Sequence, residues 1–284
     1  RGRAAVIGTN TTGKGLVHEG IAIAALEADV DFDPRPGRNS RVRASARGIE
    51  GLGRSFDRLV LTLDGQSEDP EVGIDLRAPE LTLRAAADGR FASGVWSGTW
   101  DRLDLSVGEQ VNLALDGTLA MQATTASGSV AGFCLRDALR EDSAARLCAA
   151  ADWGETGWQA QLDATQLPLS TLTAGLTPRV RYEGTVDVMA RLSALGGAPV
   201  VGRLRADLAD AQLRHRRLNG KEDVVRLGSG EIKATATPES IEATLLLDAG
   251  ATGSIEGKAL AQRSTPDFAD MPLRASLFAR TDAI

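Results

Sequence analysis

Residues 8–15 (GTNTTGKG) look like a phosphate-binding loop, because they combine glycines with a lysine and follow the apolar residues 4–7. A P-loop also needs Ser or Thr after its lysine, to bind magnesium, and a helix whose N-terminal amides face the phosphates. Here Gly15 follows Lys14, and the residues beyond it alternate as in a β-strand. We therefore predict a turn between two strands, and no binding or turnover of nucleotides.

The remaining polar groups do not combine into an active site. His18 neighbours Glu19, but adjacent residues of a strand face opposite sides. His215 lies in the basic segment 214–217 (RHRR), which is typical of a solvated hairpin tip; contact with an anionic headgroup or an acidic partner is the alternative. The sequence has no G-x-S-x-G motif, no paired-histidine metal motif and no recognisable pair of catalytic carboxylates. These features predict a protein that is not an enzyme and that holds neither a metal nor another cofactor.

The two cysteines, Cys134 and Cys148, flank the polar, helix-prone segment 136–142. A disulfide between them would close a short loop, stabilise the fold by about 3 kcal/mol and imply an oxidising compartment. Two unrelated buried thiols are the alternative. We expect the disulfide, with a structural role in holding the polar segment against the rest of the fold.

Composition indicates a globular protein that does not bind nucleic acid. The 284 residues are 43% hydrophobic and 25% charged, with a net charge of −6, and phosphate backbones require a clustered positive excess. Aromatic residues make up only 4%, so aliphatic side chains supply the apolar surface; this suits the lining of a groove, or follows from a GC-rich genome. No apolar run reaches the roughly 18 residues of a membrane span. The chain begins without Met and shows no signal peptide, so we interpret it as a piece of a longer protein whose anchor and export signal lie outside it.

Alternation of apolar and polar residues dominates the chain. It is clear at 59–64 (LVLTLD) and 72–77 (VGIDLR), and it resumes at 158–163, 186–192 and 241–247. Asp-Gly, Asp-Pro and Ala-Pro pairs separate the runs, as expected for short strands joined by tight turns. The pattern predicts an all-β protein: an elongated, curled antiparallel sheet that forms an open, solenoid-like groove. Helical signals are confined to 135–147 and 168–176, so one or two short helices are expected.

The domain organisation expected from these signals has three parts. Residues 1–132 form a β-groove segment, residues 133–176 a short helical excursion with the disulfide and a linking strand, and residues 177–284 a second groove segment that continues the same sheet. Trp96 and Trp100, four residues apart, are expected to share one strand face and to pack in the core. Parity within each strand predicts the set of residues that line the groove: Leu61, Leu63, Ile74, Leu76, Leu83, Leu105, Leu113, Leu115, Met121, Val186, Val188, Leu192, Leu208, Leu245 and Leu247.

A series of short motifs runs through most of the chain. In order, they are residues 13–32, 51–65, 94–103 (GVWSGTWDRL), 133–135 (FCL), 147–148 (LC) and 167–172 (LPLSTL). In this series the chain resembles the TamB family of AsmA-like bridging proteins of Gram-negative envelopes. The resemblance implies a "β-taco", a continuous sheet curled along its length, which carries phospholipid between the inner and outer membranes. It also implies a periplasmic location, an inner-membrane anchor outside this chain, a linked role in outer-membrane protein assembly, and contact with a TamA-like outer-membrane barrel through a region outside this chain.

Three functions therefore compete. The first is a groove that conducts lipid and contacts phospholipid acyl chains; the second is a chaperone-like scaffold that presents sheet edges to β-barrel or secreted proteins; the third is a structural spacer. If the groove is open, Leu113→Arg or Val188→Asp should block transport while leaving the fold largely intact.

Overall fold

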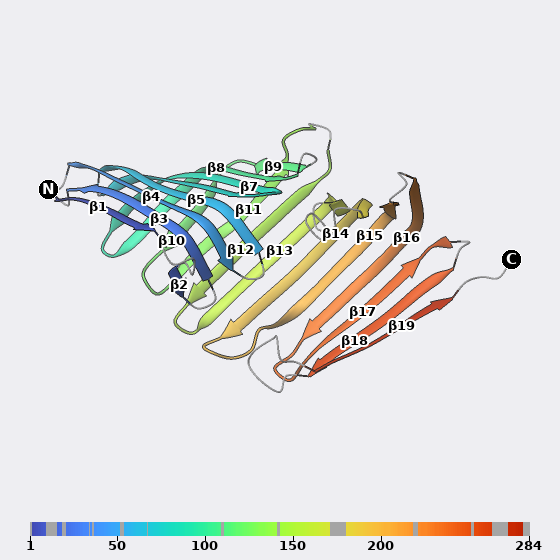
Figure 1. Cartoon of the computed structure of the whole chain (residues 1–284). Helices are drawn as coiled ribbons and strands as arrows, with labels where there is room; N and C mark the ends of the chain where they lie inside the picture. Colours follow the sequence, from blue (N-terminus) through green and yellow to red (C-terminus); the bar gives the residue numbers. More distant parts are fainter. Residues whose placement is uncertain are drawn as a thin grey trace. The chain divides into compact units, whose positions relative to one another are not determined.

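The structure is a computed structural model that describes residues 2–9, 16–18, 21–33, 35, 37–51, 54–66, 68–108, 111–140, 143–170, 180–217, 221–250, 253–262 and 272–280. These residues form nineteen β-strands, which pair antiparallel (Figure 1). The all-β antiparallel class predicted from the alternation is confirmed. The chain divides into two compact units, unit 1 (Arg1–Leu139) and unit 2 (Arg140–Ile284). The three-part division expected from the sequence stays a prediction.

Unit 1 is a meander in which each strand pairs with the next, except at its two ends. Its strands are β1 (Gly2–Thr9), β2 (Leu16–His18), β3 (Ile21–Phe32), β4 (Asn39–Gly51), β5 (Arg54–Gln66), β6 (Asp69–Ala78), β7 (Leu81–Ala92), β8 (Val95–Val107), β9 (Val111–Leu115), β10 (Leu119–Ala123) and β11 (Gly128–Asp137). β1 and β2 both pair with β3, and β9 and β10 both pair with β8 and with β11. β9 and β10 therefore behave as one strand that is interrupted at residues 116–118, where Gly117 has a φ of +92°.

Tight turns set the register of these strands. Ser93 and Gly94 form a two-residue turn between β7 and β8, and both have positive φ, as a type I′ hairpin requires. The turn fixes which residues of β7 and β8 lie opposite each other. Phe91 therefore faces Trp96, and Ala87 faces Trp100.

Unit 2 is also a meander, in which all eight strands pair in sequence order. They are β12 (Arg146–Gly154), β13 (Gly157–Pro168), β14 (Val180–Leu195), β15 (Val201–Arg216), β16 (Glu222–Ala236), β17 (Ser240–Asp248), β18 (Ser254–Gln262) and β19 (Leu273–Arg280). β14, β15 and β16 are the longest, with 15 or 16 residues each.

A line of β-bulges crosses the long strands of unit 2. The register shifts between Ala164 and Leu167 in β13, next to Gly184 in β14, and between Leu208 and Ala211 in β15. A Cβ on Gly184 would lie 2.6 Å from the carbonyl oxygen of Ala209, so only glycine fits there. Bulges at neighbouring positions of adjacent strands bend a sheet, so unit 2 is curved at this line.

One of the two expected helices is wrong. Residues 135–137 and 146–147 are strand, and residues 138–140 and 143–145 are not helical. The carboxylate of Asp137 accepts a hydrogen bond from the backbone N–H of Leu139 (2.9 Å), a local contact that competes with the first turn of a helix. In the second expected helix, residues 169–170 are helical, and residues 171–179 lie outside the described part of the chain.

The predicted disulfide is present. Cys134 in β11 and Cys148 in β12 are the only cysteines of the sequence, and both are disulfide-bonded.

Candidate functional site

Unit 1 has one face that is lined almost entirely by aliphatic side chains. Residues directly opposite each other on paired strands share a face, so the pairings assemble rows of neighbours across the sheet. Three such rows are Val42–Leu63–Val72–Ala87, Ala44–Leu61–Ile74–Ala85–Leu103 and Ala46–Leu59–Leu76–Leu83–Leu105–Leu113. None of the residues in these three rows is charged, but the next strand, β11, places Asp137 opposite Leu113 at the end of the third row.

The nine lining residues predicted in unit 1 all lie on this apolar face. Seven of them belong to the three rows. Leu115 follows Leu113 at the same parity and faces Leu135 of β11, and Met121 lies between Gly98 of β8 and Val130 of β11. Their role in contacting a ligand stays a prediction.

Exposure differs sharply along this face. Leu61, near the middle of β5, is 42% exposed, whereas Leu113, in β9, is 1% exposed. Most other members of the rows are half-buried. Because Leu113 is enclosed by its neighbours, an arginine there should disrupt packing, so its burial argues against the expectation that Leu113→Arg leaves the fold intact. Val188 is only half-buried, so we still expect Val188→Asp to leave the fold largely intact.

Two tryptophans cover part of the apolar face of unit 1. Trp96 and Trp100, both on β8, share a face and meet edge to face, with ring centroids 6.4 Å apart. A Cβ on Gly89 or Gly98 would lie 2.4 or 2.3 Å from the Trp96 ring, so the indole rests on the backbone of β7 and β8 where both lack side chains. The two buried indole N–H groups have no hydrogen-bond acceptor among the described residues.

Unit 2 has an apolar face of the same kind. Its rows are Val186–Leu208–Gly230–Leu247–Ile255, Ala164–Val188–Ala206–Ile232–Leu245–Gly257, Leu162–Ala190–Leu204–Ala234–Ala243–Ala259 and Ala160–Leu192–Gly202–Ala236–Ile241–Ala261. The six lining residues predicted in this unit all belong to these rows. Val186 is 2% exposed and Leu192 is 39% exposed, so here too one part of the face is enclosed and another is open.

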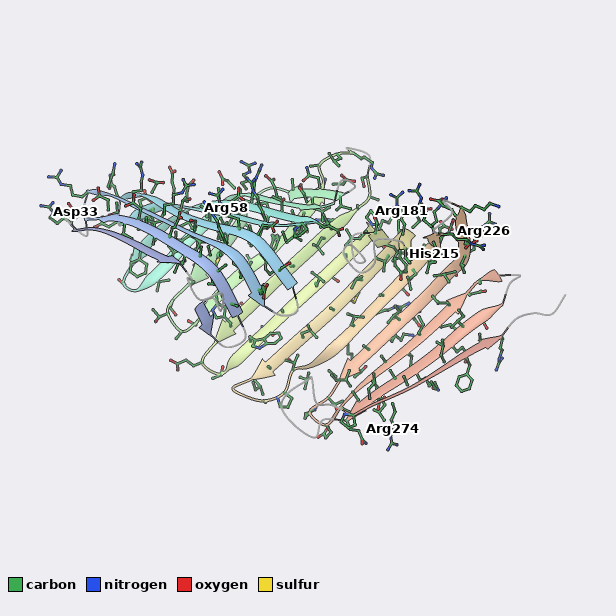
Figure 2. All side chains as sticks on the ribbon, viewed as in Figure 1. Asp33, Arg58, Arg181, His215, Arg226 and Arg274 are labelled. Atoms are coloured by element: carbon green, nitrogen blue, oxygen red, sulfur yellow. The ribbon has the colours of Figure 1, made fainter. Side chains whose placement is uncertain are left out.

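The opposite face of each unit carries ion pairs. Many of them join residues two apart on one strand, which point to the same side. Examples are Arg77 with Asp75 (2.9 Å) and Arg102 with Asp104 (2.6 Å). Hydrogen bonding from Arg77 lowers the pKa of the Asp75 carboxyl. Figure 2 draws these side chains and labels Arg58, whose Nε is buried without a partner among the described residues.

The other sequence candidates do not form a site. Residues 8 and 9 lie in β1, and residues 10–15 of the predicted turn lie outside the described part of the chain. His18 lies in β2, and exposed His215 lies opposite Asp223. Within the described ranges, no group of His, Cys, Asp and Glu could hold a metal ion.

Sequence reasoning missed the apolar positions of β3 and β4. Ala44 and Ala46 lie on the same face as Leu61 and Leu59, yet alanine is a weak apolar signal. The signal that could have found them is the alternation of Val42, Ala44 and Ala46 with arginine and serine over residues 41–47.

The pairings place this protein in the class of all-β proteins built from antiparallel strands. In each unit the described strands belong to one antiparallel ladder with an aliphatic face and a charged face, and no separate described sheet or helix covers the aliphatic one. None of the described helices is long and apolar enough to cross a membrane.

The family model described as "TamB, N-terminal domain" matches residues 3–270, so the chain belongs to the TamB family. The resemblance seen in the sequence is thereby confirmed. Members of this family are periplasmic proteins of an assembly or transport module between the two membranes, and the family is not one of enzymes. No curated protein and no solved structure gives a significant match to the chain.

Proposed function

We propose that the apolar faces of units 1 and 2 bind the acyl chains of phospholipids and serve to move phospholipid between the inner and outer membranes. The observation that carries this proposal is the set of uncharged aliphatic rows, open to solvent at Leu61 and Leu192. Each acyl CH₂ moved from water onto such a surface contributes about 0.8 kcal/mol. The ligand does not need to hydrogen-bond to the backbone, because the N–H and C=O groups of paired strands already bond to each other.

The proposal extends to where the protein works. Family membership supports a periplasmic position, an inner-membrane anchor and contact with a TamA-like outer-membrane barrel, the last two through regions outside residues 1–284. The same membership supports a linked role in outer-membrane protein assembly.

Site-specific crosslinking in cells tests the lipid proposal. A photoreactive residue at position 61 or 192 should crosslink phospholipid, and one at position 77, on the charged face of β6, should not. Mass spectrometry of the adducts identifies the lipid. Equal lipid capture at positions 61 and 77, or none at 61 and 192, would contradict an acyl-binding face.

A second candidate function is a scaffold that presents a sheet edge to other β-proteins. β19 supports it, because all its residues are exposed, including Leu273 (68%), Leu277 (68%) and Phe278 (65%), and it contains neither Pro nor Lys. Its second edge pairs with no described strand. Crosslinking from position 276 distinguishes the candidates: protein adducts with unfolded outer-membrane proteins support a scaffold, and lipid adducts alone do not.

A further inference from the structure

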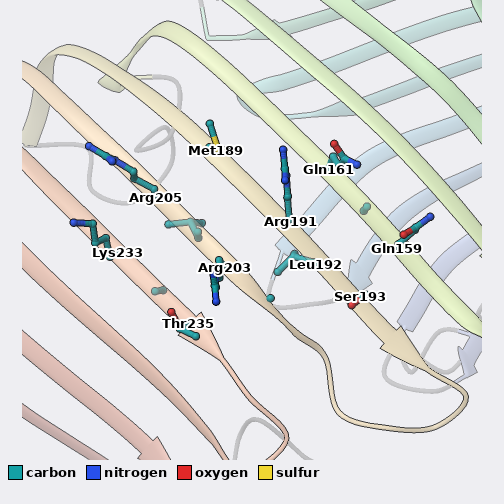
Figure 3. A pocket seen from close by; sticks show the side chains of 14 residues that line it. Gln159, Gln161, Met189, Arg191, Leu192, Ser193, Arg203, Arg205, Lys233 and Thr235 are labelled. Atoms are coloured by element: carbon teal, nitrogen blue, oxygen red, sulfur yellow. The ribbon is translucent and has the colours of Figure 1, made fainter.

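The charged face of unit 2 carries a hollow lined mainly by residues outside the apolar rows, although Leu192 and Leu204 of those rows also reach it. Its volume is about 650 Å³, and it spans β13, β14, β15 and β16 (Figure 3). Four cations line it, together with amide, hydroxyl and apolar side chains, and none of its lining residues is acidic; the cations are Arg191, Arg203, Arg205 and Lys233.

Two of these cations lack the carboxylate that accompanies the others. Arg205 is 2.9 Å from both Asp207 and Glu231, and Lys233 is 2.5 Å from Glu231. Arg191 and Arg203 form no ion pair with any residue that the structure describes.

Arg191 and Arg203 are also direct partners across β14 and β15. Gln161 lies beyond Arg191 on β13, and Thr235 lies beyond Arg203 on β16. The four residues therefore form one row, Gln161–Arg191–Arg203–Thr235, on the face opposite Leu192 and Leu204. In Figure 3 the side chains of Arg191 and Arg203 extend in opposite directions, Arg191 on the side of Gln161 and Arg203 on the side of Thr235; both are exposed and can turn toward a shared anion.

Like charges directly opposite each other destabilise a sheet, so this row is unfavourable without an anion. Two guanidinium groups provide planar sets of N–H donors, which match the oxygens of a phosphate. The flanking Gln161 and Thr235 add an amide and a hydroxyl that can donate to the same oxygens.

We propose that the row Gln161–Arg191–Arg203–Thr235 binds a phosphate group, carried either by the headgroup of an anionic phospholipid or by soluble phosphate. The four residues of the row lie on the other face of the same strands from the apolar rows, so the row can be tested separately from acyl binding at position 61.

The test uses the whole chain, two probes and a matched control. The probes are inorganic phosphate, compared with chloride at equal ionic strength, and phosphatidylcholine vesicles with or without phosphatidylglycerol. The test variant is Arg191→Gln/Arg203→Gln. The control is Arg181→Gln/Arg214→Gln, which removes another opposed arginine pair from the same strands, one in which Arg214 is 2.7 Å from Glu183.

We expect phosphate to raise the melting temperature of the wild type and of the control. The test variant should lose this increase and bind phosphate at least about ten-fold more weakly, while melting no lower than the wild type without phosphate, because its opposed charges are gone. The fold is thereby tested separately from the site.

The vesicle arm identifies the source. Binding to phosphatidylglycerol vesicles that depends on Arg191 and Arg203, and that inorganic phosphate inhibits, supports the lipid headgroup. If Arg191 and Arg203 are needed to bind inorganic phosphate but not to bind vesicles, the result supports soluble phosphate as the ligand. If the test variant behaves as the wild type does with both probes, or if the control loses as much binding, the proposal is overturned. None of these outcomes bears on acyl crosslinking at position 61.

Discussion

Individual leucines on the apolar face differ in what they contribute. Leu61 is open to solvent and Leu113 is enclosed, although parity places both on the same side of the sheet. An open position can contact a ligand, and an enclosed one contributes mainly to packing.

Charge substitutions separate these two roles. Leu61→Arg should change the free energy of unfolding by less than about 1 kcal/mol, because water reaches the new charge, and should reduce lipid recovered with the protein. Leu113→Arg should cost at least about 3 kcal/mol, because its charge would be desolvated. Urea denaturation and lipid quantification measure both effects. Thr62→Arg, on the opposite face of β5, is the control; a loss of lipid in this variant as large as in Leu61→Arg would contradict the assignment of faces.

Gly89 permits the close approach of Trp96. Gly89→Ala should destabilise the protein by about 1–3 kcal/mol, because the new Cβ would overlap the indole ring, and should alter the near-ultraviolet circular dichroism of the tryptophans. Gly132→Ala is the matched control, since a Cβ there meets nothing within 4 Å. Equal melting temperatures for the two variants would show that Trp96 does not rest on β7.

Asp33 is expected to make the stability of unit 1 depend on pH. Arg35 donates hydrogen bonds to both carboxylate oxygens of this buried residue (2.8 and 2.5 Å) and holds the pKa of Asp33 far below its ordinary value. A lowered pKa in the folded state stabilises the fold at every pH above the unfolded value, near 4, and this stabilisation is lost as the pH falls below it. Between about pH 5 and pH 2, the melting temperature of Asp33→Asn should therefore fall less than that of the wild type. Asp101→Asn, at an exposed position, controls for the loss of one charge. If the melting temperature of Asp33→Asn falls with pH as steeply as that of the wild type, Asp33 is not the source of the pH dependence.

At the scale of elements, turns and bulges decide which side chains meet. The Ser93–Gly94 turn brings Phe91 opposite Trp96, and the bulges beside Gly184 bend the longest strands. The disulfide-bonded Cys134 and Cys148 lie in strands, β11 and β12, that contain both ends of the segment in which the sequence signals a helix.

Removing the disulfide should weaken the protein without changing its ligand. Cys134→Ser/Cys148→Ser is expected to lower the free energy of unfolding by about 3 kcal/mol, because the unfolded chain regains the entropy of an open loop. Chemical denaturation of both proteins under non-reducing conditions measures the difference, and lipid content should stay unchanged. Mass spectrometry of unreduced, exported wild-type protein that finds two free thiols would rule out this role.

At the scale of the whole molecule, both units expose aliphatic surface that a soluble monomer rarely leaves open. A bound ligand that covers this surface stabilises the folded state in proportion to its saturation. The purified chain should therefore melt at a lower temperature after detergent has removed its lipid, and added phospholipid should restore the melting temperature. Soluble headgroup without acyl chains serves as the control, and restoration by headgroup alone would argue against acyl binding.

The sequence by itself determined the strand class and the face of each lining residue. Alternation is a local property, since successive side chains of a strand point to opposite sides whatever their neighbours are. For this reason Leu61, Ile74, Val188 and Leu245 could be assigned to apolar faces before any pairing was known. The order of a few short sequence motifs was also enough to indicate the TamB family.

Tertiary structure decided which of these residues are open and which distant residues become neighbours. The burial of Leu113, the overlap of Trp96 with Gly89 and the opposition of Arg191 to Arg203 all depend on register, which turns and bulges set between strands. The helix expected over 135–147 failed for a related reason: pairing with adjacent strands overrides a weak local preference. Periodicity along one strand carries no information about the strand beside it.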